Sequence, residues 1–160
     1  MQFYEPARDY GTPNKASAQS VSLLIDGQSV TVPAGTSVMR AAFEAGVKVP
    51  RLCATDSLEA FGSCRLCLVE VAGTSRLLPS CVTEVAEGME VRTATPRLSE
   101  YRRMIVELLF AERNHVCSVC VANGHCELQD LAVAVGMDNV RFDYQFPKLS
   151  VDVSHNQFGM

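Results

Sequence analysis

Residues 21–46 read VSLLIDGQSVTVPAGTSVMRAAFEAG, and this stretch decides the fold class. The two short apolar runs at its start flank Asp26-Gly27, a dipeptide that favours a tight hairpin turn between two strands. After the hairpin, Thr36 or Ser37 can cap a helix. The apolar residues on one face of that helix are Val38, Ala41, Ala42 and Ala45. A hairpin followed by a helix predicts the first part of a small α+β domain.

Two further strands complete this predicted domain. They are expected at 66–71 and 89–92, with a loop through Pro79 and Cys81 between them. The stretch 1–20 mixes proline, glycine, serine and charged residues without a period, so we expect it to form a flexible arm.

A long helix is predicted over 96–112, because Thr95 can cap it and a proline suits its first position. Its expected apolar stripe consists of Leu98, Tyr101, Ile105, Leu108 and Leu109. On the opposite face Arg103 and Glu107 are four residues apart and can pair in solvent. We expect the neighbouring Arg102 to belong to the same solvated face.

Composition excludes several classes of protein. The chain has 160 residues, of which 48% are hydrophobic and 20% charged, so it can bury an ordinary globular core. A formal net charge of −4 argues against a nucleic-acid surface, which needs a basic patch. No apolar run approaches the roughly 20 residues of a membrane span, and the first thirty residues show no secretory signal pattern. We therefore expect a cytoplasmic protein.

Seven cysteines are the most informative feature, because thiols that stay reduced in the cytoplasm more often serve metal or redox chemistry than disulfides. The first group, spaced C-x10-C-x2-C-x13-C, comprises Cys53, Cys64, Cys67 and Cys81. Four thiolates suit either zinc or an iron–sulfur cluster. Gly62 and Ser63 lie beside the ligands, where bare backbone can donate N–H bonds to cluster sulfides, and Arg65 separates the two cysteines of the CxxC. These neighbours favour a [2Fe–2S] cluster over zinc or unligated core thiols.

The second group has three cysteines and needs another donor. Its members, spaced C-x2-C-x5-C, are Cys117, Cys120 and Cys126. His115 is the leading candidate for the fourth ligand because it lies two residues before the first cysteine. His125, His155, a water molecule or a partner's cysteine are alternatives. A shorter helix over about 128–135 follows this group.

The two cysteine groups together resemble a known family. CATDSLEAFGSCRLCLVEV, LLPSCVTEVAEGMEV and the NHVCSVC stretch are similar to the diaphorase iron–sulfur subunit of NAD-reducing nickel–iron hydrogenases. The sequence also resembles the N-terminal iron–sulfur region of the large subunit of respiratory complex I and that of NAD-dependent formate dehydrogenases. In the complex I pattern the histidine stands four residues before the first cysteine, where this chain has Arg113, whereas the NHVC form resembles the hydrogenase version and points to His115.

The resemblance implies a β-grasp, ferredoxin-like domain with one [2Fe–2S] cluster, followed by a small helical module with one [4Fe–4S] cluster held by one histidine and three cysteines. The implied division is an arm over 1–20, the β-grasp domain over 21–95, the helical module over 96–146 and a tail over 147–160. The family pattern continues into a further ferredoxin-like module beyond Met160, so we expect a short variant or a fragment.

The function that the resemblance implies is electron transfer. The chain would relay electrons between a flavin- and NAD(P)-binding diaphorase subunit and a second redox site, foremost that of a nickel–iron hydrogenase, and would not be a catalyst alone. The equivalent region of a formate dehydrogenase or a complex I relative is the alternative within this class. Outside it, a zinc-stabilised binding module without a redox role is the rival.

Overall fold

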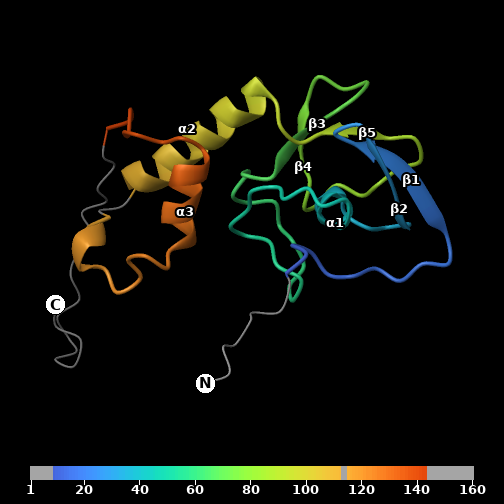
Figure 1. The fold of residues 1–160 in the computed structure, drawn as a ribbon, viewed down its shortest axis with the longest axis horizontal. Coiled ribbons are helices and arrows are strands. Elements are labelled where there is room, and N and C mark those ends of the chain that lie inside the picture. Colours follow the sequence, from blue (N-terminus) through green and yellow to red (C-terminus); the bar gives the residue numbers. More distant parts are fainter. Residues whose placement is uncertain (1–8, 113–114, 144–160) are drawn as a thin grey trace.

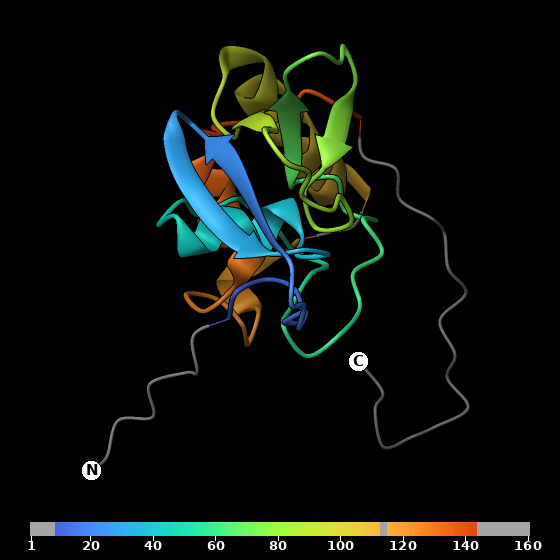
Figure 2. The ribbon, with the colours of Figure 1, turned by 90° about the vertical axis from the view of Figure 1, so that its right-hand side faces the viewer.

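The computed structural model describes residues 9–112 and 115–143. Five strands form one mixed sheet with the order β2-β1-β5-β3-β4. The strands are β1 (Ser20–Ile25), β2 (Gln28–Pro33), β3 (Leu68–Val71), β4 (Leu77–Pro79) and β5 (Glu90–Arg92). Among these strands, β1 and β5 are the one pair that runs parallel, and the other pairs are antiparallel. The pairing of β1 with β5 joins the hairpin β1–β2 to strands β3, β4 and β5 in one sheet (Figures 1 and 2).

Helix α1 (Val38–Glu44) follows the hairpin and packs against the sheet (Figure 1). The predicted cap is confirmed, because the Ser37 hydroxyl accepts a hydrogen bond from the Arg40 backbone N–H at 3.1 Å. The predicted apolar face is also confirmed in its centre, since Ala41 and Ala42 are fully buried. Together with Ile25 of β1, these residues belong to the main core of the α+β domain.

The second part of the structure is a helical module. It contains α2 (Pro96–Glu112), a 3₁₀ turn (Cys117–Val119) and α3 (Glu127–Ala134), and it lies beside the sheet domain rather than over it (Figure 1). The Thr95 hydroxyl caps α2 by accepting a hydrogen bond from the Leu98 backbone N–H at 3.2 Å, as predicted. A second apolar cluster joins the sheet domain to the helical module. In it Leu66 of the sheet domain packs with Val106 of α2 and Ala132 of α3.

The face of α2 that is buried differs from the predicted stripe. Tyr101 and Leu108 are 39% and 47% exposed, so their assignment to the apolar stripe was wrong. The buried residues of the helix are Leu98, Arg102, Val106, Glu107 and Ala111. Because α2 contacts both β3 and α3, its covered surface is wider than one stripe and rotated relative to the one that hydrophobicity alone indicates.

Two charged residues of α2 were also misplaced by the prediction. Arg102 is 7% exposed and not part of a solvated face, because its guanidinium donates to two backbone carbonyls of the sheet domain. Arg103 and Glu107 do pair, at 2.9 Å, but Glu107 is completely buried rather than solvated. Arg141, beyond α3, binds the other oxygen of that carboxylate at 2.8 Å.

Further findings concern strand β4, the N-terminal segment, membrane-spanning helices and the C-terminal tail. The segment expected to be only a loop through Pro79 contains strand β4, which pairs with β3. Where the structure describes the N-terminal segment, it makes specific contacts, since the Asp9 carboxylate pairs with Arg51 at 3.0 Å and Thr12 is buried. No helix in the described ranges is long and apolar enough to cross a membrane. The expected tail over 147–160 lies outside the described residues.

Candidate metal centres

The first four cysteines are brought together in two pairs. Cys53 and Cys64 come from the loop between α1 and β3, and their sulfur atoms lie 3.3 Å apart. Cys67, just before β3, and Cys81, just after β4, have sulfur atoms 3.4 Å apart. The hydrogen-bonded pairing of β3 with β4 therefore places the second pair, and the loop that folds back on Cys53 places the first.

The arrangement of the four sulfurs in two pairs distinguishes a [2Fe–2S] site from a zinc site. Metal–sulfur bonds of about 2.3 Å put two thiolates of one tetrahedral metal about 3.8 Å apart. Both sulfur–sulfur distances lie below that value by about half an ångström or less. Across the described residues, however, no three histidine, cysteine or carboxylate side chains gather around a single point. Two pairs suit two irons with two cysteines each, whereas one zinc ion needs all four sulfurs around it.

The loop between the ligands has an unusual backbone. Gly62 has a φ of +66°, and a Cβ there would lie 3.3 Å from a methyl group of Val82. Arg65 has a φ of +59°, a conformation that costs a residue with a side chain. The Cys64 backbone N–H points to the Cys53 sulfur at 3.4 Å. The loop thus turns N–H groups inward towards sulfur, while the Arg65 side chain is exposed.

The thiols of this group differ in acidity. The hydrogen bond between Cys67 and Cys81 lowers the pKa of Cys67 to about 6, despite its burial, and raises the pKa of Cys81. Burial raises the pKa of Cys64, although the backbone N–H of Leu66 acts in the opposite direction. A metal would have to displace the remaining thiol protons, so loading of this site must release protons.

Ser80 tests whether the residues present fit a sulfur-rich group. Its side chain is completely buried, and in the described structure its hydroxyl has no nitrogen or oxygen partner. The same hydroxyl lies close enough to Cys67 to contribute to its lowered pKa. Buried hydroxyls are normally hydrogen-bonded, and a cluster sulfur or the Cys67 thiolate is the acceptor within reach. The residues present therefore fit an iron–sulfur cluster.

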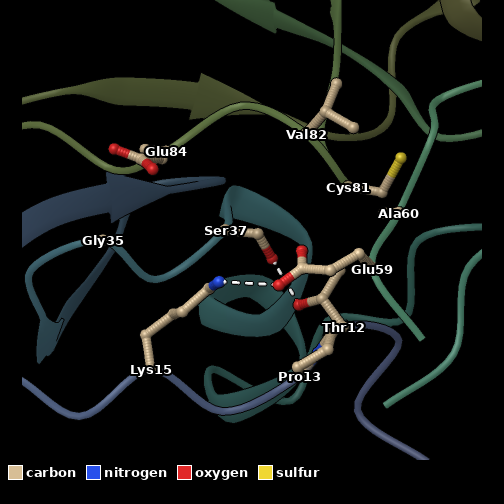
Figure 3. A pocket seen from close by; sticks show the side chains of 10 residues that line it. All are labelled: Thr12, Pro13, Lys15, Gly35, Ser37, Glu59, Ala60, Cys81, Val82 and Glu84. Carbon is tan, nitrogen blue, oxygen red and sulfur yellow. Dashed lines mark hydrogen bonds and ion pairs between the residues drawn. The ribbon is translucent and has the colours of Figure 1, made fainter. Parts of the chain in front are cut away.

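A pocket leads from the surface to Cys81 (Figure 3). The N-terminal segment forms one wall, where the Thr12 hydroxyl lies 2.7 Å from that of Ser37. Lys15 and Glu59 form an ion pair across it at 2.9 Å. These contacts lie over Cys81, which is 4% exposed, so the segment before β1 helps to shield this predicted ligand from solvent.

The second cysteine group lies on the loop between α2 and α3. Cys117 starts the 3₁₀ turn, Cys120 is exposed, and Cys126 is the residue before α3. As in the first group, no three side chains of ligand type gather around a single point among the described residues. Ligands of a four-iron cluster are bound to different irons and stand farther apart than ligands of one ion, so the group stays a predicted site.

His115 makes a contact suited to a metal ligand. Its Nε2 atom lies 3.1 Å from the Leu109 carbonyl oxygen, and its ring packs against Phe110. His115 and His125 are both exposed, and the contact with Leu109 distinguishes His115, while Arg113 and His155 lie outside the described residues.

Comparison with known families agrees with this chemistry. Residues 18–96 match the family described as a 2Fe-2S iron-sulfur cluster binding domain, and residues 102–141 match the NADH-ubiquinone oxidoreductase-G iron-sulfur binding region. The chain is an iron–sulfur protein built from these two domains. The expected α+β fold and the expected pair of cofactors, one [2Fe–2S] and one [4Fe–4S] cluster, are confirmed.

The relatives that this chain is similar to are subunits of NAD-linked oxidoreductases. The chain is 42% identical over 122 residues to a G-type NADH-quinone oxidoreductase subunit of Rhizobium meliloti, covering 76% of this chain and 14% of that protein. It is 38% identical over 133 residues to the gamma subunit of the NAD-reducing hydrogenase HoxS of Cupriavidus necator, covering 83% of this chain and 56% of that protein.

A solved structure shows the same likeness in three dimensions. A chain of an NAD+-reducing [NiFe]-hydrogenase in the H2-reduced state superposes with a TM-score of 0.78 at 38% identity, covering 86% of this chain and 58% of the other. The resemblance to the hydrogenase family is thus confirmed. The chain spans little more than half the length of these hydrogenase proteins and far less of the quinone oxidoreductase protein.

Sequence reasoning found the cysteines but missed two neighbours. Ser80 directly precedes the predicted ligand Cys81, and that position was its only signal in the sequence. Arg102 is far from every cysteine in the sequence, and nothing in a local pattern links it to the cluster loop. Only the packing of α2 against the residues before β3 brings it there.

Proposed function

We propose that this chain relays electrons between a flavin- and NAD(P)-binding subunit and a second redox centre, as part of an NAD-reducing hydrogenase. The observation that carries the proposal is the arrangement of four sulfurs as two pairs, with separations of 3.3 and 3.4 Å. Cys53 and Cys64 would bind one iron of a [2Fe–2S] cluster, and Cys67 and Cys81 the other. When bound, such a cluster accepts and donates single electrons, which is the chemistry that side chains lack.

The chain's own residues would hold and tune that cluster. The loop N–H groups around Gly62 and Ser63 would face its sulfur atoms, and the exposed Arg65 would lie at its rim. The apolar cluster of Leu66 and Val106 limits water around the site. The division into a [2Fe–2S] domain over 21–95 and a helical module over 96–146 belongs to this proposal.

The second cluster would be a [4Fe–4S] group held by His115 and three cysteines. Its loop exposes apolar side chains, with Val119 79% exposed and Val121 fully exposed. Apolar residues gathered around a redox centre are typical of a surface that another subunit covers. We therefore propose that the partner subunits, of the hydrogenase type or of the formate dehydrogenase type, bind against this loop. We propose the cytoplasm as the location of the complex.

A complex I relative is the second candidate. It is favoured by the 42% identity to the Rhizobium meliloti quinone oxidoreductase protein, which exceeds the 38% identity to the Cupriavidus necator hydrogenase protein. The larger share of this chain that aligns with the hydrogenase protein, 83% against 76%, and the structural match to a hydrogenase chain at a TM-score of 0.78 favour the hydrogenase.

The experiment is to co-express the chain with the flavin subunit of its complex and to add NADH without oxygen. We expect both clusters to be reduced, with paramagnetic signals that grow at the same rate as NADH is consumed. A Cys67→Ala variant of the same complex is the control, because it should lose the [2Fe–2S] signal alone. A complex whose clusters stay oxidised under NADH, although dithionite reduces them, would contradict the relay.

A further inference from the structure

Arg102 is a buried cation without a carboxylate partner. Its side chain belongs to α2, yet its Nε donates to the Leu66 carbonyl at 3.1 Å and its Nη2 to the Leu68 carbonyl at 2.8 Å. In the described part of the chain, no carboxylate oxygen lies within 4.0 Å of its nitrogens. Neutral carbonyls satisfy hydrogen bonds but do not balance a charge, and buried charges are normally paired.

The place of Arg102 indicates where its counter-charge lies. Leu66 separates Arg65 from Cys67, so the guanidinium holds the backbone of the CxxC loop directly before a proposed iron ligand. Burial lowers the pKa of this guanidinium, and the negative groups that act against burial are Cys67 and, after it, Asp26. An arginine at such a site stays protonated, because its ordinary pKa is far above neutral pH.

We propose that Arg102 is the counter-charge of the [2Fe–2S] cluster and raises its reduction potential from the neighbouring helical module. The inference rests on the proposed ligand set of Cys53, Cys64, Cys67 and Cys81. Reduction adds one electron to the cluster and takes no proton from Arg102. A fixed positive charge beside the cluster stabilises the more negative, reduced state, and apolar surroundings weaken the screening of that attraction. Leu66 and Val106 supply those surroundings.

The consequence is a link between the two modules. The α2 helix that leads to the second cysteine group also carries the charge that tunes the first cluster. A shift of α2 relative to β3 would move that charge, so the potential of the [2Fe–2S] cluster depends on how the helical module is seated. Arg102 is a positioning and tuning residue, since it contacts the ligand loop and not the reacting centre.

The test compares midpoint potentials of the [2Fe–2S] cluster in the full chain, measured by redox titration with paramagnetic detection. Arg102→Met removes the charge at similar length, Arg102→Gln keeps a hydrogen-bond donor without charge, and Arg102→Lys keeps the charge. We expect the neutral variants to lower the reduction equilibrium constant at least tenfold, which is about 59 mV for one electron. Arg102→Lys should recover most of that loss. Arg97→Met removes an exposed charge from the same helix and should leave the potential unchanged.

The failures are separable. A wild-type chain without a [2Fe–2S] signal would contradict the ligand set and hence the proposed function. A wild-type signal whose potential is the same in Arg102→Met and Arg102→Gln would overturn the role of Arg102 alone. If Arg102→Met does not retain iron, the comparison is between the other two variants. A midpoint potential in Arg102→Gln that equals or exceeds the midpoint potential in Arg102→Lys would then overturn the role of Arg102. Loss of the cluster in all three variants would also overturn it, because the retained charge of lysine would then be without effect.

Discussion

The imidazole of His115 donates a hydrogen bond from Nε2 to the Leu109 carbonyl oxygen, 3.1 Å away. A carbonyl oxygen can only accept, so Nε2 carries a proton, and it is Nδ1 that has the free lone pair in the neutral ring. Histidines that bind metals commonly donate their other ring N–H to a backbone carbonyl in this way. The end of α2 therefore holds His115 in the tautomer that a metal ligand requires.

This relationship gives a prediction for the second cluster. His115→Ala should leave the [2Fe–2S] signal unchanged and make the second cluster labile or three-iron, because one iron then lacks a protein ligand. His125→Ala is the matched control and should change neither cluster. Iron content and the paramagnetic spectra of the anaerobic protein measure both effects. A stable four-iron cluster in His115→Ala, together with its loss in His125→Ala, would assign the ligand to the neighbour of Cys126.

Ser80 leads to a second prediction. Its buried hydroxyl is within reach of Cys67 and has no other partner among the described residues, so it can donate to sulfur at the cluster. Ser80→Ala should retain the cluster but lower its midpoint potential, because loss of a donor to sulfur destabilises the reduced state. Redox titration measures the shift. Thr36→Val is the control, since it removes another buried hydroxyl that is not adjacent to a predicted ligand. An unchanged potential in Ser80→Ala would show that the hydroxyl does not face the cluster.

Glu107 provides a prediction about stability. Burial raises the pKa of its carboxyl, but hydrogen bonds from Arg141 and Arg103 outweigh burial and hold the pKa below its ordinary value of 4.5. A lowered pKa means that its contribution to the free energy of unfolding is complete above about pH 4.5 and is lost as the pH falls below that value. Glu107→Gln should remove about 1–3 kcal/mol at neutral pH, as expected for charge-assisted hydrogen bonds.

Chemical denaturation followed by circular dichroism checks this figure. Glu100→Gln, an exposed change on the same helix, should alter the free energy of unfolding by no more than about 0.5 kcal/mol. Equal losses in the two variants would mean that the ion pairs of Glu107 contribute nothing specific.

The sheet domain could be predicted largely from local sequence. Asp26-Gly27 fixes the hairpin, and Ser37 and Thr95 cap their helices as expected, because turns and caps depend on neighbouring residues. The cysteine spacing predicts the ligand set, and the structure brings Cys53 to Cys64 and Cys67 to Cys81. Strand β4 was missed because its three residues, Leu77–Pro79, are too few for a period to be visible.

Tertiary packing decided what the sequence could not show. The helical period of α2 favoured Tyr101 and Leu108 as core residues, yet both are exposed. Arg102 and Glu107 are charged residues that a sequence pattern assigns to the surface. In the structure Arg102 donates to a backbone carbonyl before β3, and Glu107 binds two arginines, of which Arg141 lies 34 positions away. Buried charges depend on partners that are distant in the chain, so a local pattern cannot reveal them.

The central claim is that two separate cysteine groups hold two clusters. Its most direct test is iron and sulfide analysis with paramagnetic spectra of the anaerobically purified, reduced chain, in wild type and in Cys64→Ala. We predict about six irons in the wild type, two plus four, and about four in Cys64→Ala, with only the [2Fe–2S] signal lost. Stoichiometric zinc with negligible iron in the wild type, or loss of both signals in a folded Cys64→Ala variant, would contradict the account.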